Sequence, residues 1–325
     1  MGQKKKPQVL VTRRLPEAGM ELLNRYCEVE VAEEDRTLTK EKLLQQIKEK
    51  QGLLSLVTDR VDSQVMDAGS SLKVISNYAV GYDNIDVREA QRRGITVTNT
   101  PDVLTHATAD MTWALLMDVA RRVTESDRVV RAGGWKEWAP QFMLGKEVTG
   151  SVLGIVGLGR IGRAVARRAK GFDMRVLYYS RTRLRMEEEK GLGVEYRDLQ
   201  TLLQEADFVS LHVPSSPKTR HMIGEQELSW MKPTAYLINT ARGDLVDEQV
   251  LVRFLREGKI AGAGLDVYEH EPRLTPGLSE LDQVVLAPHI GSATLETRQH
   301  MAIMAAQNLI DELYGKTSPN RVIIP

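Results

Sequence analysis

The chain has 325 residues, of which 42% are hydrophobic and 27% charged, and this length and composition predict a globular protein of two domains. Its 44 lysines and arginines equal its 44 aspartates and glutamates, which excludes a strong net charge for binding nucleic acid or an acidic membrane surface. The single cysteine, Cys27, excludes an internal disulfide and favours the cytoplasm, and no apolar run reaches the ~20 residues of a membrane helix.

The first hundred residues alternate between strand-like and helix-like patterns. Pro16 suits the first turn of a helix, where its missing N–H is not needed, and Thr39 is a candidate cap for the next helix. The alternation predicts a parallel sheet covered by helices. The expected strands are Gln8–Thr12, Val29–Val31, Gly52–Val57 and Lys73–Ser76, and the expected helices are Pro16–Arg25 and Lys40–Glu49.

One long helix is predicted from Leu104 to Val123, followed by a break at Gly133 and Gly134. A second strand–helix series follows, and its first helix is expected at Ile161–Lys170. Six strands separated by helices predict a doubly wound dinucleotide-binding domain. These strands are Val152–Val156, Met174–Tyr179, Phe208–Val213, Ala235–Asn239, Gly262–Asp266 and Val284–Ala287.

A glycine motif of the form G-x-G-x-x-G follows the first strand of this series and opens its helix, which is the context that dinucleotide binding requires. The first glycine permits a tight turn, the second lets the backbone approach a pyrophosphate, and the third allows the helix to pack on the strand. The helix N-terminus then offers N–H groups to the phosphates. The alternative is a glycine turn of purely structural purpose. The motif consists of Gly157, Leu158, Gly159, Arg160, Ile161 and Gly162.

The second strand of the series ends at Ser180-Arg181-Thr182-Arg183. An NAD-preferring domain places an acid there, on the ribose hydroxyls. This chain has no carboxylate at that point, whereas Arg181 and Arg183 could neutralise a 2′-phosphate. The segment therefore predicts NADP, with NADPH preferred. If the arginines are only surface charges, NAD remains possible.

Three later segments carry the groups that reduction of a ketone acid needs, namely a cation for the carboxylate and an acid for the forming alkoxide. They are Asn239–Gly243, His270–Pro272 and Pro288–Ser292, and each follows a predicted strand, where open α/β sheets bind ligands. Within them, Arg242, Glu271 and His289 are the candidates. Singly, each has a structural alternative, and His270 rivals His289 as the acid because it neighbours Glu271.

The order and spacing of these motifs resemble the D-isomer-specific 2-hydroxy-acid dehydrogenase family over essentially the whole chain. Within that family, Tyr179–Thr182 and the stretch Trp135–Gly145 are most similar to the glyoxylate/hydroxypyruvate reductases. One departure is His106, which stands where the family has an acid. The matching segments are Asn77–Asp86, Gly154–Gly162, Asn239–Gly243, Ala263–Val267, Glu271–Pro272 and Pro288–Ala293.

The resemblance implies a role for each matching residue. Arg242 would bind the substrate carboxylate and carbonyl, His289 would donate the proton, and Glu271 would orient His289. The backbone of Val80 and Gly81 would bind the carboxylate. Other residues implied at the substrate are Leu53, Ser292 and, from the partner subunit, Trp138, for which the alternative is an aromatic anchor of the dimer. At the cofactor, Asp266 would meet the nicotinamide carboxamide and Thr108 the phosphates. The further cofactor residues are Gly157–Gly162, Ser180, Arg181, Thr182, Val213, Pro214, Thr240, Ala241 and Gly291.

The expected fold class is therefore α/β, with two Rossmann-like domains and the active site in the cleft between them. Residues 1–99 and 290–325 would form a flavodoxin-like substrate domain, and residues 100–289 a dinucleotide domain that includes a dimerisation arm. The expected activity is NAD(P)H-dependent reduction of glyoxylate or hydroxypyruvate by a cytoplasmic homodimer, with no metal, nucleic acid or membrane partner. The alternatives are a dehydrogenase for D-lactate or a branched 2-oxo acid, and a nicotinamide-sensing protein similar to the corepressors that share this fold.

Overall fold

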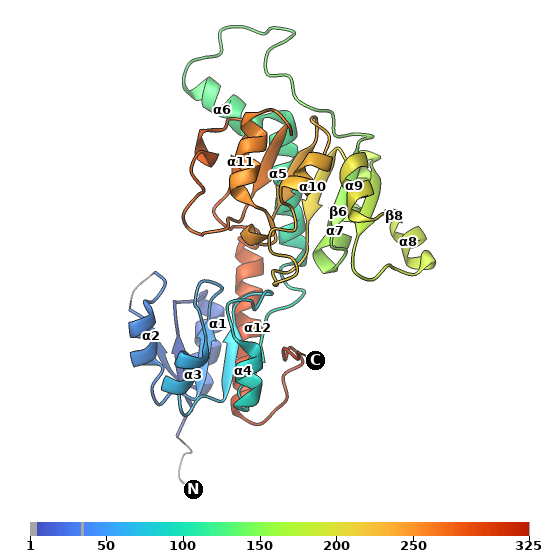
Figure 1. The fold of residues 1–325 in the computed structure, drawn as a ribbon. Coiled ribbons are helices and arrows are strands. Elements are labelled where there is room, and N and C mark those ends of the chain that lie inside the picture. Colours follow the sequence, from blue (N-terminus) through green and yellow to red (C-terminus); the bar gives the residue numbers. More distant parts are fainter. Residues whose placement is uncertain (1–4, 34–35, 325) are drawn as a thin grey trace. The chain divides into compact units, whose positions relative to one another are not determined.

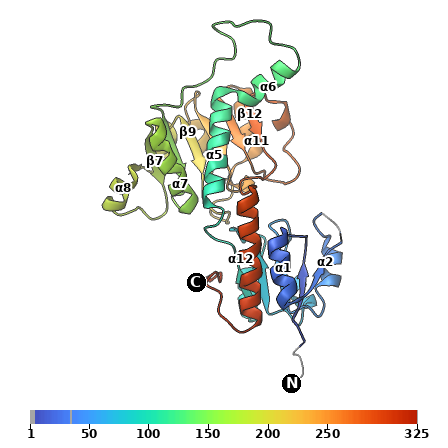
Figure 2. The same cartoon turned by 180° about the vertical axis from the view of Figure 1, so that it is seen from behind.

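The computed structural model describes residues 5–33 and 36–324, and the chain divides into two compact units (Figures 1 and 2). The first unit is Met1–Leu104 with Ala293–Pro325, and the second unit is Thr105–Ser292. Each unit contains one sheet in which every paired strand is parallel. The predicted α/β class with two Rossmann-like sheets is therefore confirmed.

The first unit has a five-stranded sheet in the order β2-β1-β3-β4-β5, which is the flavodoxin-like order. Both faces of β3 and β4 are buried, as expected for a parallel sheet covered by helices. The strands are β1 (Gln8–Val11), β2 (Glu28–Val31), β3 (Gly52–Ser55), β4 (Val74–Asn77) and β5 (Thr96–Thr98). The helices are α1 (Glu17–Tyr26), α2 (Lys40–Gln46), α3 (Ser63–Ala68), α4 (Val87–Arg92) and the C-terminal α12 (Leu295–Leu313).

Helix α12 completes the first unit although it is more than 180 residues from the rest of it in sequence. It packs on α1, where a Cβ added to Gly19 would lie 2.7 Å from the Cβ of Ala302, and the close approach of the two helices therefore requires glycine. The Ser76 hydroxyl donates to the Ala305 carbonyl at 2.8 Å, and the Tyr78 hydroxyl to the Arg298 carbonyl at 2.8 Å. These contacts attach α12 to the strand β4.

The second unit has a seven-stranded sheet in the order β12-β11-β10-β9-β6-β7-β8, the Rossmann order with one further strand. The prediction of six strands missed β8, a three-residue edge strand with Glu195 at its centre, because three residues are too few to show a strand periodicity. The strands are β6 (Val152–Val156), β7 (Arg175–Tyr179), β8 (Val194–Tyr196), β9 (Phe208–Leu211), β10 (Tyr236–Asn239), β11 (Gly262–Leu265) and β12 (Val284–Leu286).

The predicted helix Leu104–Val123 is present as α5 (Thr105–Arg121), and a further helix that was not predicted, α6 (Val123–Arg131), begins directly after it. Arg122 between them has a left-handed φ of 55°, and the Asp118 carboxylate accepts from the Thr124 N–H at 2.7 Å to cap the new helix. Helix α5 packs on α7 and the strands β10 and β11, whereas α6 has no buried residue. The remaining helices are α7 (Arg160–Ala169), α8 (Met186–Leu192), α9 (Leu199–Glu205), α10 (Glu225–Trp230) and α11 (Glu248–Arg256), with 3-10 turns at Lys170–Phe172, Gly243–Leu245 and Leu278–Glu280.

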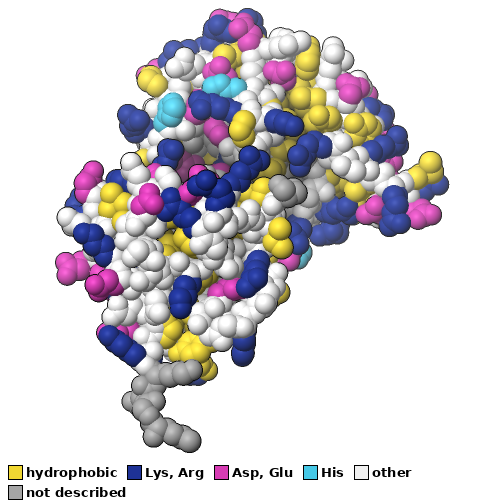
Figure 3. Space-filling model, turned by 60° about the horizontal axis from the view of Figure 1, so that its bottom comes forward, with side chains coloured by type: hydrophobic (Ala, Val, Ile, Leu, Met, Phe, Trp, Pro, Cys, Tyr) yellow, Lys and Arg dark blue, Asp and Glu magenta, His cyan; other side chains and the backbone are white. Residues whose placement is uncertain are grey.

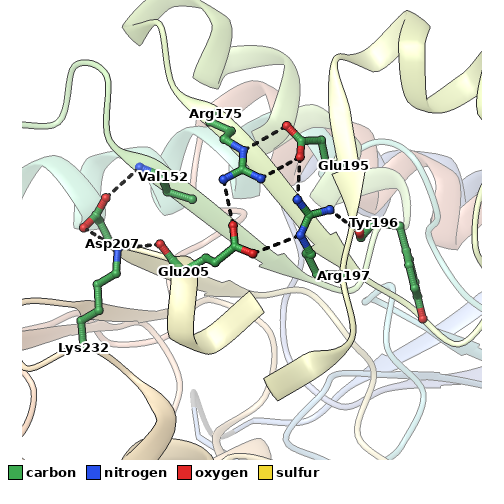
Figure 4. Close-up of polar contacts among 8 residues, drawn as sticks. All are labelled: Val152, Arg175, Glu195, Tyr196, Arg197, Glu205, Asp207 and Lys232. Atoms are coloured by element: carbon green, nitrogen blue, oxygen red, sulfur yellow. Dashed lines mark hydrogen bonds and ion pairs between the residues drawn. The ribbon is translucent and has the colours of Figure 1, made fainter. Parts of the chain in front are cut away.

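A charged network lies at the amino ends of the strands of the second unit (Figure 4). The Arg175 guanidinium contacts Glu195 at 2.8 and 3.0 Å and Glu205 at 2.8 Å. Asp207 accepts from the Val152 N–H at 2.9 Å. These contacts hold the pKa values of Glu195 and Glu205 below their usual range, although burial opposes the change at Glu205. Structural ion pairs thus lie at the side of the sheet where the strands begin, opposite to their carboxyl ends.

Basic and acidic side chains are mixed over the face of the molecule in Figure 3, in keeping with the balanced composition. In the described part of the chain, no helix combines the length and the apolar composition that crossing a membrane requires.

Candidate active site

The glycine motif forms a turn between β6 and α7 that only glycine can adopt at two of its positions. Gly157 has a φ of 98°, and a Cβ there would lie 2.6 Å from the His212 carbonyl oxygen. A Cβ on Gly162 would overlap the Gly157 carbonyl. By contrast, nothing lies within 4 Å of a Cβ on Gly159, and no side chain caps the first turn of α7. This open space before a helix N-terminus fits a dinucleotide pyrophosphate.

The strand β9 lies beside β6, and its carboxyl end contributes the other side of this turn. The Val213 side chain packs against Gly157, and Pro214 follows it. His212 bonds to the Ser210 hydroxyl at 2.8 Å, and burial lowers the pKa of His212 to about 3. This histidine is therefore neutral and structural. Because the chain leaves β6 toward β7 and returns to β9, this is the switch point where doubly wound sheets bind nucleotides.

The segment after β7 is held by a buried tyrosine. The Tyr178 hydroxyl accepts from the Leu184 N–H at 2.9 Å and donates to the Glu189 carboxylate at 2.7 Å. Glu189 in turn binds Arg183 at 2.8 and 3.0 Å, and these partners lower the pKa of Glu189 to about 2. Of the two predicted phosphate-binding arginines, Arg183 is thus occupied by a carboxylate. Arg181 is exposed between Ser180 and Thr182.

The structure brings together Glu271 and His289, which lie 18 residues apart. His289 Nδ1 is 2.8 Å from Glu271 Oε2, and the Tyr268 N–H donates to Glu271 Oε1 at 3.0 Å. Burial raises the pKa of Glu271, but these bonds and the charges of His289 and Arg242 outweigh it and hold that pKa below its usual range. Ionised Glu271 accepts the Nδ1 proton, which leaves Nε2 of His289 available to a ligand.

Asp266 fixes the loop that carries His289. Its buried carboxylate accepts from the Ile290 N–H at 2.7 Å and the Gly291 N–H at 2.6 Å, and its carbonyl accepts from the His289 N–H at 2.9 Å. His289 itself has a left-handed φ of 54°. A Cβ on Gly291 would lie 3.0 Å from Asp266 Oδ2 and 3.5 Å from Thr108, so these three predicted cofactor residues are neighbours.

Arg242 lies in a loop that Asn239 closes at the end of β10. The Asn239 amide donates to the Arg242 carbonyl at 2.8 Å and accepts from the Ala241 N–H at 3.0 Å. Gly243 next to it packs so tightly on the Tyr268 backbone that a Cβ would overlap it. Behind the loop, the hydroxyls of Thr240 and Thr112 are 2.8 Å apart. The charge of Arg242 is one of the causes that lower the pKa of Glu271. Arg242 therefore influences the pair formed by Glu271 and His289.

The remaining predicted residues have different environments. Val80 and Gly81 are half-buried in the segment after β4 of the first unit, and Ser292 is half-buried at the end of the second unit. Trp138, in the segment after α6, is 79% exposed. Leu53, however, is fully buried in the core of β3, two residues before that strand ends. Its side chain belongs to the core because both faces of this strand are covered.

Sequence reasoning missed the residues that hold the site in place. Asn239 stands in the quoted motif but carried no role, and Tyr178 and Glu189 had none. His270, the rival acid, is exposed, and its backbone carbonyl accepts from the Arg273 N–H at 2.9 Å. Among residues 5–33 and 36–324, no cluster of three or more His, Cys, Asp or Glu side chains is arranged to hold a metal ion.

Comparisons with known proteins agree over nearly the full length. Residues 113–291 match the family "D-isomer specific 2-hydroxyacid dehydrogenase, NAD binding domain". A glyoxylate reductase of Pyrococcus furiosus is 53% identical over 321 residues, which cover 98% of this chain and 95% of that protein. The crystal structure of TT0316 protein from Thermus thermophilus is 48% identical with a TM-score of 0.91, covering 97% of this chain and 100% of the other. An NADPH-dependent glyoxylate/hydroxypyruvate reductase from Sinorhizobium meliloti, solved with NADP and malonate, is 33% identical with a TM-score of 0.85, covering 98% and 97%.

Proposed function

The chain belongs to the D-isomer specific 2-hydroxyacid dehydrogenase family, whose members are nicotinamide-dependent oxidoreductases, and we propose that glyoxylate or hydroxypyruvate is the 2-oxo acid that it reduces. The observation that carries this choice is the 53% identity to a glyoxylate reductase over 98% of the chain. The named reductase from Sinorhizobium meliloti, at 33% identity, supports the same small substrates. The pair formed by His289 and Glu271 supplies the proton chemistry that such a reduction requires.

In this proposal the second unit holds the cofactor, along Gly157–Gly162 and near Thr108, Asp266 and Gly291. When bound, the reduced nicotinamide supplies a hydride to the carbonyl carbon of the substrate. The Arg242 guanidinium binds the carboxylate and polarises the carbonyl, and the backbone of Val80 and Gly81 in the first unit also binds the carboxylate. His289 donates the proton from Nε2 to the carbonyl oxygen, and Glu271 stabilises the charged imidazole before the transfer.

The proposal is tested by the loss of reduced-nicotinamide absorbance with purified protein. Glyoxylate, hydroxypyruvate, pyruvate and a bulky branched 2-oxo acid are compared with NADPH and with NADH. We expect the highest kcat/KM for glyoxylate or hydroxypyruvate. A higher value for pyruvate or the branched acid would assign the protein to another dehydrogenase of the family. No turnover with any acid would contradict the enzymatic proposal and favour the sensor alternative.

We propose further that the cofactor is NADPH by preference, because Arg181 is exposed beside the predicted ribose site and the segment Ser180–Arg183 contains no Asp or Glu. The Arg181→Ala variant is expected to raise the KM for NADPH by roughly 10- to 100-fold, the range for a lost charge-assisted bond, and to change the KM for NADH little. Steady-state kinetics with both cofactors measure this. Arg185→Ala, which removes an exposed arginine paired with Glu188, is the matched control. An unchanged KM for NADPH would exclude Arg181 from binding the 2′-phosphate.

We also propose that the chain forms a homodimer through α6 and the segment 132–147. Figure 1 shows this segment extending away from the sheet of the second unit. Six apolar side chains of α6 and this segment are between 46% and 79% exposed, which is unusual for a surface that contacts only water. Helix α5, by contrast, uses its apolar side chains in the core. The exposed residues are Val123, Val130, Trp135, Trp138, Phe142 and Leu144.

A charge introduced into this apolar segment tests the dimer. Leu144→Asp is expected to shift the mass in sedimentation from dimer to monomer, because an unpaired carboxylate in an apolar interface costs several kcal/mol, on the order of 2–5. Met186→Asp on α8, which charges another side chain exposed by 66%, should leave the mass unchanged. A monomeric wild type would contradict the proposal. With the dimer intact, a raised substrate KM in Trp138→Ala would place that tryptophan at the partner subunit's site.

A further inference from the structure

Three consecutive backbone carbonyls in the first unit are each held by a hydrogen bond. The Ala79 carbonyl accepts from the Thr100 N–H at 2.9 Å. The Val80 carbonyl accepts from the Asn99 side-chain amide at 2.8 Å, and the Gly81 carbonyl accepts from the Asn77 side-chain amide at 2.8 Å. The segment follows β4, at the carboxyl edge of the five-stranded sheet. Donors at the end of β4 (Asn77) and after β5 (Asn99 and Thr100) thus fix three consecutive peptide groups.

A held carbonyl also sets the direction of the next N–H. In a planar trans peptide the N–H points opposite to the carbonyl of the preceding residue. The bond to Ala79 therefore orients the Val80 N–H, the bond from Asn99 orients the Gly81 N–H, and the bond from Asn77 orients the N–H of Tyr82. Among the described residues, none of these three N–H groups has a recorded hydrogen bond. Val80 and Gly81 are only half-buried, so these donors can receive a ligand.

The two asparagines are themselves held. The Asn99 backbone carbonyl accepts from the Asn308 amide at 2.9 Å, and the Asn99 N–H donates to the Asn320 carbonyl at 3.2 Å. Asn77 is fully buried, and its side-chain oxygen accepts from the Ser55 hydroxyl at 3.1 Å. These contacts fix the backbone of Asn99 and the side chain of Asn77 before any ligand arrives, as a preorganised anion site requires.

We propose that Asn99 and Asn77 are positioning residues for the substrate carboxylate. Asn99 turns the Gly81 N–H away from the protein and toward the negative charge, and Asn77 fixes the next peptide group of the same segment. Neither side chain touches the substrate itself. This inference rests on the proposed function, which places the carboxylate at Val80 and Gly81, and it extends that function by assigning binding strength to residues outside the site.

Replacement of Asn99 by alanine tests the proposal, with Ser76→Ala as the matched control. Ser76 also loses a buried bond to a backbone carbonyl, at 2.8 Å to Ala305, but it lies in β4 and does not hold the carboxylate segment. For Asn99→Ala we expect a KM for glyoxylate and an inhibition constant for malonate that are both raised roughly tenfold, since one bond to a charged group is weakened. The kcat should change little, because the carboxylate contact is the same in the ground and transition states.

The readouts separate this inference from a loss of stability and from the proposed function. The dissociation constant of NADPH should stay within about twofold of the wild type, and the denaturant midpoint should fall as much as in Ser76→Ala. If Asn99→Ala does not fold, Asn99→Leu keeps the volume and removes the donor. An active wild type with an unchanged KM in the variant would overturn the inference alone. An inactive wild type would overturn the function, and malonate binding would then still decide the role of Asn99.

Discussion

Replacement of His289 by alanine is expected to lower kcat by roughly 10²- to 10⁴-fold, the usual contribution of a positioned general acid. His289 Nδ1 lies 2.8 Å from Glu271, and the proposed mechanism assigns the proton transfer to the other ring nitrogen, Nε2. Affinity for NADPH should remain within about twofold, because in that mechanism His289 transfers the proton and does not bind the cofactor. Stopped-flow measurement of a single turnover and fluorescence titration of NADPH give the two quantities.

The matched control is His270→Ala, because His270 also neighbours Glu271 in sequence but is exposed, and its backbone carbonyl bonds to the Arg273 N–H. It should keep nearly full activity. A collapse of turnover in His270→Ala, with His289→Ala active, would reverse the assignment.

The kcat of Glu271→Gln should lie between those of His289→Ala and His270→Ala, since glutamine keeps the shape but removes the charge that stabilises the imidazolium. Glu271, whose pKa is held below its ordinary 4.5, should support activity until the pH falls through that lowered value.

Replacement of Arg242 by alanine is expected to lower kcat/KM for glyoxylate by roughly 10³-fold or more, because it removes both a charge paired with the carboxylate and the polarisation of the carbonyl. Both KM and kcat should change, unlike in a variant that weakens binding alone. Arg242→Lys should recover part of the loss, since it keeps the charge but not the two-pronged guanidinium. Steady-state kinetics over a wide range of glyoxylate concentrations measure these effects.

The control for Arg242 is Arg253→Ala, which removes an exposed arginine paired with Glu225 in the same unit. Its kinetics should match the wild type. Because Arg242 lowers the pKa of Glu271, the alanine variant should also lose activity at a higher pH on the acid side than the wild type does. If Arg242→Ala kept its kcat/KM, the carboxylate would have to bind to another cation.

Much of the fold and the chemistry of the site could be predicted, because they depend on local patterns. Apolar runs predicted most strands, and the motif Gly157–Gly162 predicted the turn that the structure contains. Arg242, Glu271 and His289 were proposed from their chemistry and order, and the structure brings the last two into contact. Side-chain type and spacing suffice for such features because the strand order of a doubly wound sheet brings successive carboxyl ends to one edge.

The rest depends on contacts between residues far apart in the sequence. Asn99 bonds to the Val80 carbonyl, and Asp266 bonds to the loop that carries His289. The spacing of these residues in the sequence does not predict either hydrogen bond. Leu53 was placed in the site by resemblance, whereas its burial follows from helices covering both faces of its strand. The helix α6 was not predicted, because its start depends on the Asp118 carboxylate that accepts from the Thr124 N–H, and because it buries no residue. Arg183 was a candidate for binding the 2′-phosphate, but its guanidinium bonds to Glu189, six residues later. The sequence alone does not show this pairing.

The charged network of Figure 4 has a consequence for how this protein can change with its surroundings. Arg175 begins β7, and its partners are Glu195 in the edge strand β8 and Glu205 at the end of α9, whereas the glycine turn and His289 follow the carboxyl ends of strands. Ion-pair networks gain importance as temperature rises and weaken as salt is added. Adaptation to a hotter or saltier habitat can therefore add or remove charges at one margin of the sheet, while selection for catalysis acts on the other.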